Sequence, residues 1–295
     1  MFQLLGIPPQ ALFGQLLLGL INGSFYALLS LGLAVIFGML NVVNMAHGAL
    51  YMVGAFVAWL LLTYVGIGYW PALVLAPLIV GALGLVLERT MLRRLYKVDH
   101  LYGLLLTFGL ALIFEGAFRH QFGVSGQPYP IPDLLKGGTN LGFMFLPTYR
   151  GWVVGFSILV CGATWFAIER TKLGAYLRAA TENPTLVQAF GINVPVMVSL
   201  TYGFGVALAG LAGVLAAPIY QVNPLMGANL IIVVFAVVVI GGMGSILGAI
   251  VTGLGLGLLE GVTKVFYPEA SNIVVFVIMA VVLMIKPAGL FGREK

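Results

Sequence analysis

The stretch MVSLTYGFGVALAGLAGVLAAPI, residues 197–219, contains no charged side chain over 23 consecutive positions. A helix of about 20 apolar residues is long enough to cross the hydrocarbon core of a bilayer. Eight other apolar runs occur along the chain, at about 11–37, 45–65, 70–87, 101–118, 151–168, 228–246, 247–266 and 271–286. The sequence therefore predicts an all-α fold, a polytopic transmembrane helix bundle with about 8–9 spans that forms a single membrane-spanning domain over residues 1–295.

The amino-acid composition agrees with a protein that faces the lipid bilayer over most of its surface. Hydrophobic residues make up 61% of the 295 positions, charged residues 8%, and the mean hydropathy is +1.09. A soluble domain carries about a quarter charged residues, because its surface is solvated. The net charge of +5 does not indicate a nucleic-acid partner, since Lys and Arg lie at the ends of apolar runs instead of forming one basic face.

The distribution of Lys and Arg predicts the orientation of the chain in the membrane. Ten of the 14 cations lie in the alternate connections that the positive-inside rule assigns to the cytoplasm: Arg89, Arg93, Arg94, Lys97, Arg170, Lys172, Arg178, Lys286, Arg293 and Lys295. The other four, Arg119, Lys136, Arg150 and Lys264, fall on the opposite side. We therefore expect a cytoplasmic C-terminus, and counting the spans places the N-terminus outside.

Two connections between the predicted spans are long. Residues 119–150 are rich in Pro and Gly and are expected to form an extracytoplasmic loop, on the same side as the short turn 219–227. Residues 169–196 are expected on the cytoplasmic side and carry the most regular polar pattern in the chain. Long ordered loops are commonly functional, so both segments are candidates for binding a partner.

A short helix is predicted within the cytoplasmic segment. Asn183 can cap a helix, Pro184 suits its first position, and Gly191 suits the left-handed residue that stops it. A helix at about 184–190 then has one apolar face, formed by Leu186, Ala189 and Phe190. Two helical turns are unstable in water by themselves. The helix therefore packs against a partner protein or rests on lipid, and the spacing favours neither.

Two apolar regions are interrupted by residues that end helices. Gly38, Asn41 and Asn44 interrupt the first region, and a group of glycines interrupts 228–266, namely Gly241, Gly242 and Gly244. Such interruptions indicate discontinuous or re-entrant helices that face protein or water. Small residues also recur four positions apart, a spacing that lets helix backbones approach closely in lipid. These are Gly19 and Gly23, Ala209 and Gly213, and Gly253, Gly257 and Gly261.

Polar side chains near the first interruption are the candidates for a solute path. Asn41, Asn44 and His47 lie in otherwise apolar sequence, and Asn22 and Tyr26 form a second polar stripe at four-residue spacing. Polar groups at membrane depth are satisfied by neighbouring helices or by a water-filled path. The pattern allows both interpretations, interhelical hydrogen bonds or pathway lining, for each of these residues.

No Asp, Glu, Lys or Arg lies in the middle of an apolar run, and the deepest carboxylates are expected to be Glu115 and Glu260. Each has a cation four residues later, Arg119 or Lys264, which predicts a helical ion pair. Carriers coupled to protons or sodium usually need intramembrane carboxylates, so their lack here argues that the energy for transport enters from elsewhere.

The sequence also lacks motifs for ATP or metal binding. None of the six lysines follows a glycine, so no phosphate-binding loop is present, and the lone Cys161 forms no metal site. The chain is expected to be no enzyme and to hold no cofactor or metal.

Several segments resemble a known family of transporters. NGSFYAL (22–28), LGLAVIFG (31–38) and VNMAHG (43–48) are similar to the N-terminal signature of LivH-type permeases of bacterial branched-chain amino acid ABC importers. GAYLRAATENPTLVQAFGIN (174–193) resembles the cytoplasmic coupling segment of that family, and two glycine-rich segments, 208–213 and 239–245, continue the match. The resemblance spans essentially the whole chain. It implies that 169–196 contacts an ATPase through Arg178, Glu182, Asn183, Pro184, Gln188, Phe190 and Gly191.

The resemblance also implies a location and a set of partners. It implies a multi-pass permease of the bacterial inner membrane, paired with a LivM-type second permease. Two cytoplasmic ABC ATPase subunits would use the ATP, and an extracytoplasmic binding protein would deliver the substrate. Branched-chain amino acids are the leading substrate, although urea- and amide-type permeases share the scaffold. Met45 and Ala49 stand where many members have Phe and an acidic residue. A stand-alone secondary carrier and a membrane scaffold are the remaining alternatives.

Overall fold

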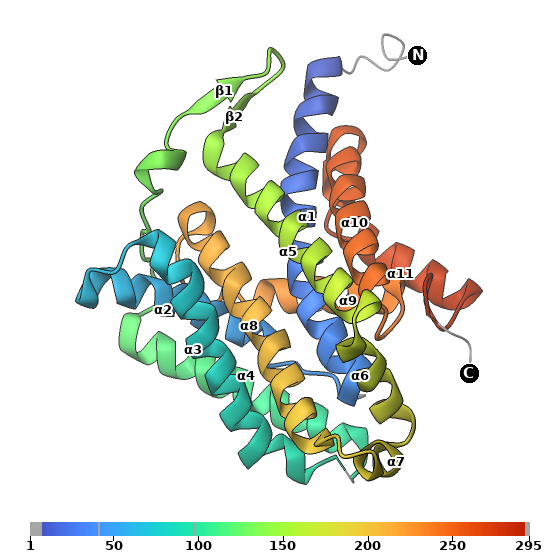
Figure 1. Ribbon diagram of the computed structural model, residues 1–295. Helices are drawn as coiled ribbons and strands as arrows, with labels where there is room; N and C mark the ends of the chain where they lie inside the picture. Colours follow the sequence, from blue (N-terminus) through green and yellow to red (C-terminus); the bar gives the residue numbers. More distant parts are fainter. Residues whose placement is uncertain (1–7, 41, 97, 293–295) are drawn as a thin grey trace.

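The computed structural model describes residues 8–40, 42–96 and 98–292. Figure 1 shows a bundle of α-helices with one small β-hairpin. The helices are α1 (Pro9–Leu40), α2 (His47–Leu60), α3 (Tyr69–Thr90), α4 (His100–Phe122), α5 (Thr148–Arg170), α6 (Lys172–Glu182), α7 (Pro184–Ala189), α8 (Val194–Tyr220), α9 (Ala228–Gly241), α10 (Ile246–Phe266) and α11 (Val274–Ile285). Shorter turns are a π-helical extension of α2 (Leu61–Val65) and 3₁₀ turns at Leu92–Arg94, Asp133–Leu135 and Pro268–Ala270. Strands β1 (Gly138–Asn140) and β2 (Phe145–Pro147) pair antiparallel, with Gly138 opposite Pro147.

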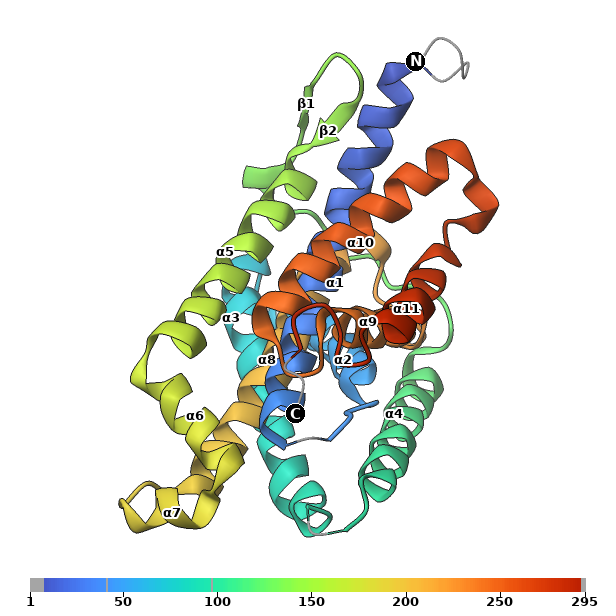
Figure 2. The ribbon, with the colours of Figure 1, turned by 90° about the vertical axis from the view of Figure 1, so that its right-hand side faces the viewer.

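The molecule has two ends, which Figures 1 and 2 show from two sides. The hairpin end carries β1, β2 and the first turns of α1. The opposite α7 end carries α6, α7 and the connection between α3 and α4. Helices α1 and α8 lie centrally and are mostly buried, whereas α4 and α5 expose most of their residues. This arrangement gives α5 a large outward-facing apolar surface.

In the part of the chain that the structure describes, every apolar run predicted from the sequence forms a helix, and seven of these helices are long and apolar enough to cross a membrane. The other two, α9 and α11, have 14 and 12 residues. At about 1.5 Å per residue they are shorter than the roughly 30 Å core of a bilayer. The expected bundle of 8–9 spans is thus seven long helices and two short ones. The chain is a polytopic membrane protein.

Both predicted interruptions are present, and they meet in space. Helix α1 continues past Gly38 to Leu40, so the first break lies later than expected. The second break separates α9 from α10, where Gly242 and Gly244 have φ angles of +98° and +86° that favour glycine. A Cβ atom added to Gly38 would lie 3.2 Å from the Cα of Gly244. The end of α1 therefore packs directly against the start of the α10 segment.

The glycines spaced four apart bring helix backbones together, as the sequence predicts. A Cβ atom on Gly19 would clash with the carbonyl oxygen of Gly257, and Gly23 faces Leu254. On α8, Gly213 lies against the backbone of Tyr51 in α2. Helices α1 and α10 therefore pack at a distance that leaves no room for a side chain.

The two long connections are more ordered than the sequence suggests. Because α4 extends to Phe122 and α5 begins at Thr148, the predicted loop 119–150 is confined to residues 123–147 and contains the β-hairpin. The segment 169–196 is largely helical. Its predicted short helix is α7, and α6 precedes it without having been anticipated.

Replacing Gly257 by valine should lower the free energy of unfolding by about 1–3 kcal/mol, because the added methyl groups push α10 away from α1. The matched control is Gly255→Val on the same helix, where a Cβ atom meets no neighbour within 4 Å. Both changes alter helix propensity equally, so only packing distinguishes them. Thermal unfolding of the purified variants in detergent measures the difference, and equal stability of the two would contradict the packing argument.

Candidate functional site

A cavity of about 370 Å³ with a mixed polar and apolar lining lies between α1, α2, α8, α9 and the turn before α9. We call it the amide pocket, because three of its lining residues are asparagines. The lining residues are Asn22, Phe25, Tyr26, Tyr51, Tyr220, Asn223, Met226, Asn229 and Leu230. Its wall combines amide and phenol groups with aromatic and aliphatic surface, and none of these residues carries a formal charge. Such a lining suits a small solute with both polar and apolar parts.

Hydrogen bonds fix the polar side chains of the amide pocket. The Tyr220 hydroxyl donates to Oδ1 of Asn22 at 3.0 Å, which joins α8 to α1. The Tyr26 hydroxyl donates to Oε2 of Glu260 at 2.9 Å, and Nζ of Lys264 donates to Oε1 of the same carboxylate at 2.5 Å. Glu260 is 7% exposed and is held by these two donors behind the pocket wall. Its ion pair with Lys264 is the one that the sequence predicts.

The five predicted pathway residues do not lie together. Asn22 and Tyr26 line the amide pocket. Asn44 and His47 are buried away from that lining, and Asn41 lies outside the described residues. Nδ2 of Asn44 donates to the Tyr202 hydroxyl at 3.0 Å, and its Oδ1 accepts from the backbone N–H of Ala46 at 3.1 Å. In the described structure Asn44 stabilises the first break.

His47 lies at the start of α2 and is fully buried. Its Nε2 lies 3.0 Å from the carbonyl oxygen of Leu29, so this nitrogen carries the proton and donates to α1. The imidazole therefore ties the start of α2 to the middle of α1.

Sequence reasoning missed the most deeply buried carboxylate among the described residues. Glu88 is 1% exposed, more buried than Glu260, although it lies one residue beyond the apolar run predicted at 70–87. It accepts from the Ser199 hydroxyl at 2.5 Å and from the Tyr96 hydroxyl at 2.8 Å. Burial, followed by this hydrogen bond to Glu88, raises the pKa of Tyr96. Glu88 lies near the end of α3, where it links the connection after α3 to the first turns of α8.

The predicted signals for α7 are confirmed in detail. Asn183 Oδ1 accepts from the backbone N–H of Leu186 at 3.0 Å, Pro184 is the first helical residue, and Gly191 has a φ angle of +82°. Val187 is buried against Ala180 and Val194, two residues of α6 and α8.

The outward face of α7 is apolar and unpartnered within the described chain. Phe190 is 77% exposed and Leu186 is 54% exposed. Glu182 and Gln188 are exposed beside them. Arg178 forms an ion pair with Glu169 at 3.3 Å and donates to the carbonyl oxygen of Ile168 at 3.1 Å, which fixes α6 against the end of α5. The segment is thus a small rigid unit that presents two large apolar side chains to solvent.

The two connections near the hairpin end are joined to each other. The backbone N–H of Gln127 donates to the carbonyl oxygen of Val222 at 2.7 Å, and the reverse bond is 2.9 Å long. Gln221, the one non-glycine residue with a positive φ angle in the described chain, lies against Gly126. The 123–147 connection and the turn before α9 therefore form one continuous surface beside the amide pocket.

Comparison with known proteins identifies the chain. Residues 15–283 match the family described as branched-chain amino acid transport system / permease component. The chain belongs to this family. It is 32% identical to the high-affinity branched-chain amino acid transport system permease protein BraD of Pseudomonas aeruginosa, over 95% of this chain and 96% of BraD.

Two further relatives come from Escherichia coli K12. The permease protein LivH is 29% identical over 95% of this chain and 96% of LivH. The permease protein LivM is 28% identical over 92% of this chain and 68% of LivM. The protein is accordingly a LivH-type permease subunit of an ATP-binding-cassette importer.

Water access distinguishes the amide pocket from the buried break. In a Cys161→Ala background, Asn229→Cys should react readily with a water-soluble maleimide, because Asn229 is exposed and lines the pocket. Asn44→Cys is the control and should react at least about a hundredfold more slowly, since Asn44 is 1% exposed and a site must open before it can be labelled. Labelling rates of the two variants in inverted and right-side-out vesicles give the comparison. Comparable rates would show that water reaches the break.

Proposed function

We propose that this permease forms one half of a translocation pathway for leucine, isoleucine and valine, with the amide pocket as part of that pathway. The match of the family over residues 15–283 carries the proposal. In this assignment the protein is no enzyme and holds no cofactor, and ATP is used by partner subunits. A LivM-type permease supplies the other half, which fits the existence of a second homologous permease protein among the relatives.

The chemistry of the amide pocket supports such a substrate. A branched-chain amino acid has a zwitterionic head and an apolar tail. Asn22, Asn223 and Asn229 supply donors and acceptors for the head, and Phe25 and Leu230 supply apolar surface for the tail. Uncharged groups bind a substrate weakly enough to release it, because a buried charge would hold an opposite charge tightly. Amides also suit urea, which therefore remains the competing substrate for the same pocket.

The α7 end carries the features expected of an ATPase docking site. Placing this end in the cytoplasm follows the distribution of Lys and Arg and puts the C-terminus on the same side. Phe190 and Leu186 then face a groove of the ATPase, and Asn183 and Gly191 hold the helix that presents them. An exposed aromatic residue on a rigid support is typical of the side chains that dominate interface energies.

Phe190→Ala should weaken ATPase binding by about 2 kcal/mol, or roughly thirtyfold in Kd, because it removes the exposed aromatic side chain that caps the C-terminal end of α7. The control is Phe145→Ala, which removes a 60% exposed phenylalanine from β2 at the hairpin end. Binding of the purified ATPase to nanodisc-embedded importer measures both. The docking assignment fails if the two variants lose the same affinity, or if neither loses any.

The surface at the hairpin end is proposed to receive the loaded binding protein. It comprises residues 123–147 and the turn 221–227, which the Gln127–Val222 bonds hold together. This surface adjoins the amide pocket through Asn223. A binding protein docked here would release its substrate next to the pathway.

Replacing residues 139–146 by Asn-Gly should reduce the stimulation of ATP hydrolysis by loaded binding protein roughly tenfold, the effect of losing about 1.4 kcal/mol of binding. The ends of the deleted segment are strand partners, so a two-residue turn closes the gap without strain. Basal ATPase activity should stay unchanged, because the α7 end is untouched. Normal stimulation in this variant would exclude the hairpin from the docking surface.

Co-purification and uptake test the whole assignment. The tagged chain should purify with a second permease and with ATPase subunits, and vesicles containing the assembly should take up labelled leucine only with ATP and binding protein. Competition by excess valine but not urea would support branched-chain amino acids. Competition by urea alone would indicate that the substrate is urea or an amide and not a branched-chain amino acid. Uptake by the chain alone, without ATP, would indicate a secondary carrier.

A further inference from the structure

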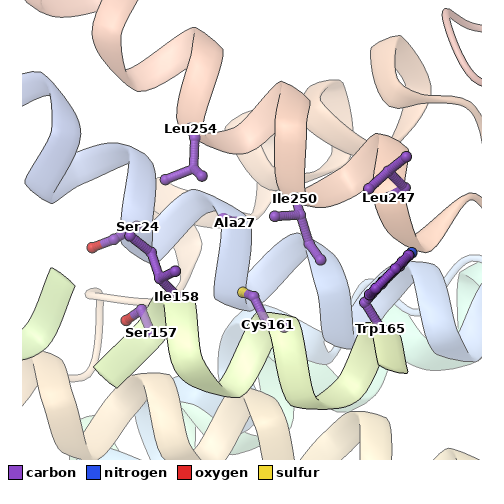
Figure 3. Close-up of a pocket in the computed structure, with 10 residues that line it drawn as sticks. Ser24, Ala27, Ser157, Ile158, Cys161, Trp165, Leu247, Ile250 and Leu254 are labelled. Carbon is purple, nitrogen blue, oxygen red and sulfur yellow. The ribbon is translucent and has the colours of Figure 1, made fainter. Parts of the chain in front are cut away.

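An apolar cavity of about 180 Å³ lies between α1, α5 and α10, away from the amide pocket. Figure 3 shows its lining side chains converging from the three helices. We call it the α5 cavity. Its lining residues are Ser24, Ala27, Ser157, Ile158, Cys161, Gly162, Trp165, Leu247, Ile250 and Leu254. Two of them, Ile158 and Leu247, are 48% and 43% exposed, so the cavity opens onto the outer surface of the bundle.

The surface around this opening is apolar. Leu159 and Phe166 on α5 are 65% and 59% exposed. In a membrane such a helix face lies against lipid acyl chains, because no water is present there. The α5 cavity is therefore a hollow in a surface that already contacts hydrocarbon.

The length of the cavity along α5 is close to the thickness of the hydrocarbon in one leaflet of a bilayer. Along α5, Ser157 and Trp165 are eight residues apart, or about 12 Å at 1.5 Å per residue. Half of the hydrocarbon core is about 15 Å thick. Trp165 marks the outer limit of the cavity toward the α7 end, and tryptophan is enriched at the boundary between hydrocarbon and headgroups.

Cations lie just beyond this boundary. The guanidinium of Arg170 lies 5.7 Å from the centre of the Trp165 ring. Arg170 and Lys172 are both exposed at the junction of α5 and α6. Arginine and lysine next to a membrane surface attract anionic headgroups.

We propose that the α5 cavity binds one acyl chain of an anionic phospholipid, with the phosphate beside Arg170 and Lys172. The chain passes Trp165, lies along Cys161 and Ile250, and ends near Ser157. The Ser157 hydroxyl has no partner within the described residues. A rotation of the Ser157 side chain would let its hydroxyl donate to the carbonyl four residues earlier in α5, and a hydrocarbon at this end of the cavity would then leave no polar group unpaired.

Photo-cross-linking tests the site in the assembled importer. The probe is phosphatidylglycerol with a diazirine in the middle of one acyl chain, diluted into phosphatidylcholine vesicles. Gly162→Leu fills the cavity, and Gly155→Leu is the control on the same helix. An added Cβ meets no neighbour within 4 Å at either glycine, so both variants should fold. Cross-linked peptides containing residues 157–165 should fall about tenfold in Gly162→Leu and stay unchanged in Gly155→Leu, because a leucine side chain displaces several methylene groups of the lipid.

A second variant tests whether the bound lipid has an anionic headgroup. Arg170→Gln should reduce the preference for the phosphatidylglycerol probe over a matched phosphatidylcholine probe about fivefold. Equal labelling by the two probes in the parent protein would overturn the anionic headgroup. Equal labelling in Gly162→Leu and Gly155→Leu would overturn the site, leaving only ordinary boundary lipid. Cross-links from this face to the second permease would also overturn it, because a protein would then cover the cavity.

Discussion

The contact of α1 with α10, backbone against backbone, is the constraint on which the rest of this structure depends. In lipid there is little hydrophobic gain from burying one apolar helix against another, so association relies on close packing. Gly19, Gly23 and Gly257 provide it by removing side chains from the contact. Farther along the same pair, the Ser30 hydroxyl donates to the carbonyl oxygen of Ala249 at 3.2 Å. This helix pair brings the break after α1 against the break before α10.

The polar side chains inside this bundle form two groups, one that holds helices together and one that lines a cavity. Asn44, His47 and Glu88 are buried and each is hydrogen-bonded to a neighbouring helix, so they hold the broken and terminal parts of helices in place. Asn22 and Tyr220 bond to each other at the edge of a cavity, where further amides remain available to a solute. Glu260 belongs to the first group although it approaches the pocket, because Tyr26 and Lys264 already occupy its oxygens.

The sequence predicts the helices, the breaks and α7 well because each depends on local signals. Long apolar runs, glycines spaced four apart, and the Asn183, Pro184 and Gly191 signals act over a few residues. The site is harder to predict, since the amide pocket combines residues that are some 200 positions apart, such as Asn22 and Asn229. The sequence pattern put Asn22 and Asn44 in one candidate set, and their roles separate only in the fold, where Asn44 bonds to Tyr202 and Asn22 to Tyr220 at the other end of α8. Glu88 was missed because its burial comes from Ser199 and Tyr96, which no pattern around residue 88 reveals.

The exposed face of α7 has a consequence for the life of the protein in the cell. On the cytoplasmic placement proposed for α7, a newly made chain would carry Phe190 and Leu186 into water on a helix whose position Val187 and the Asn183 cap fix. Exposed apolar residues of this kind promote aggregation and recognition by chaperones and proteases. If the ATPase covers this face, as proposed, a permease without its ATPase would expose it. The supply of one subunit would then limit the lifetime of the other, and surplus permease would be removed without any dedicated signal.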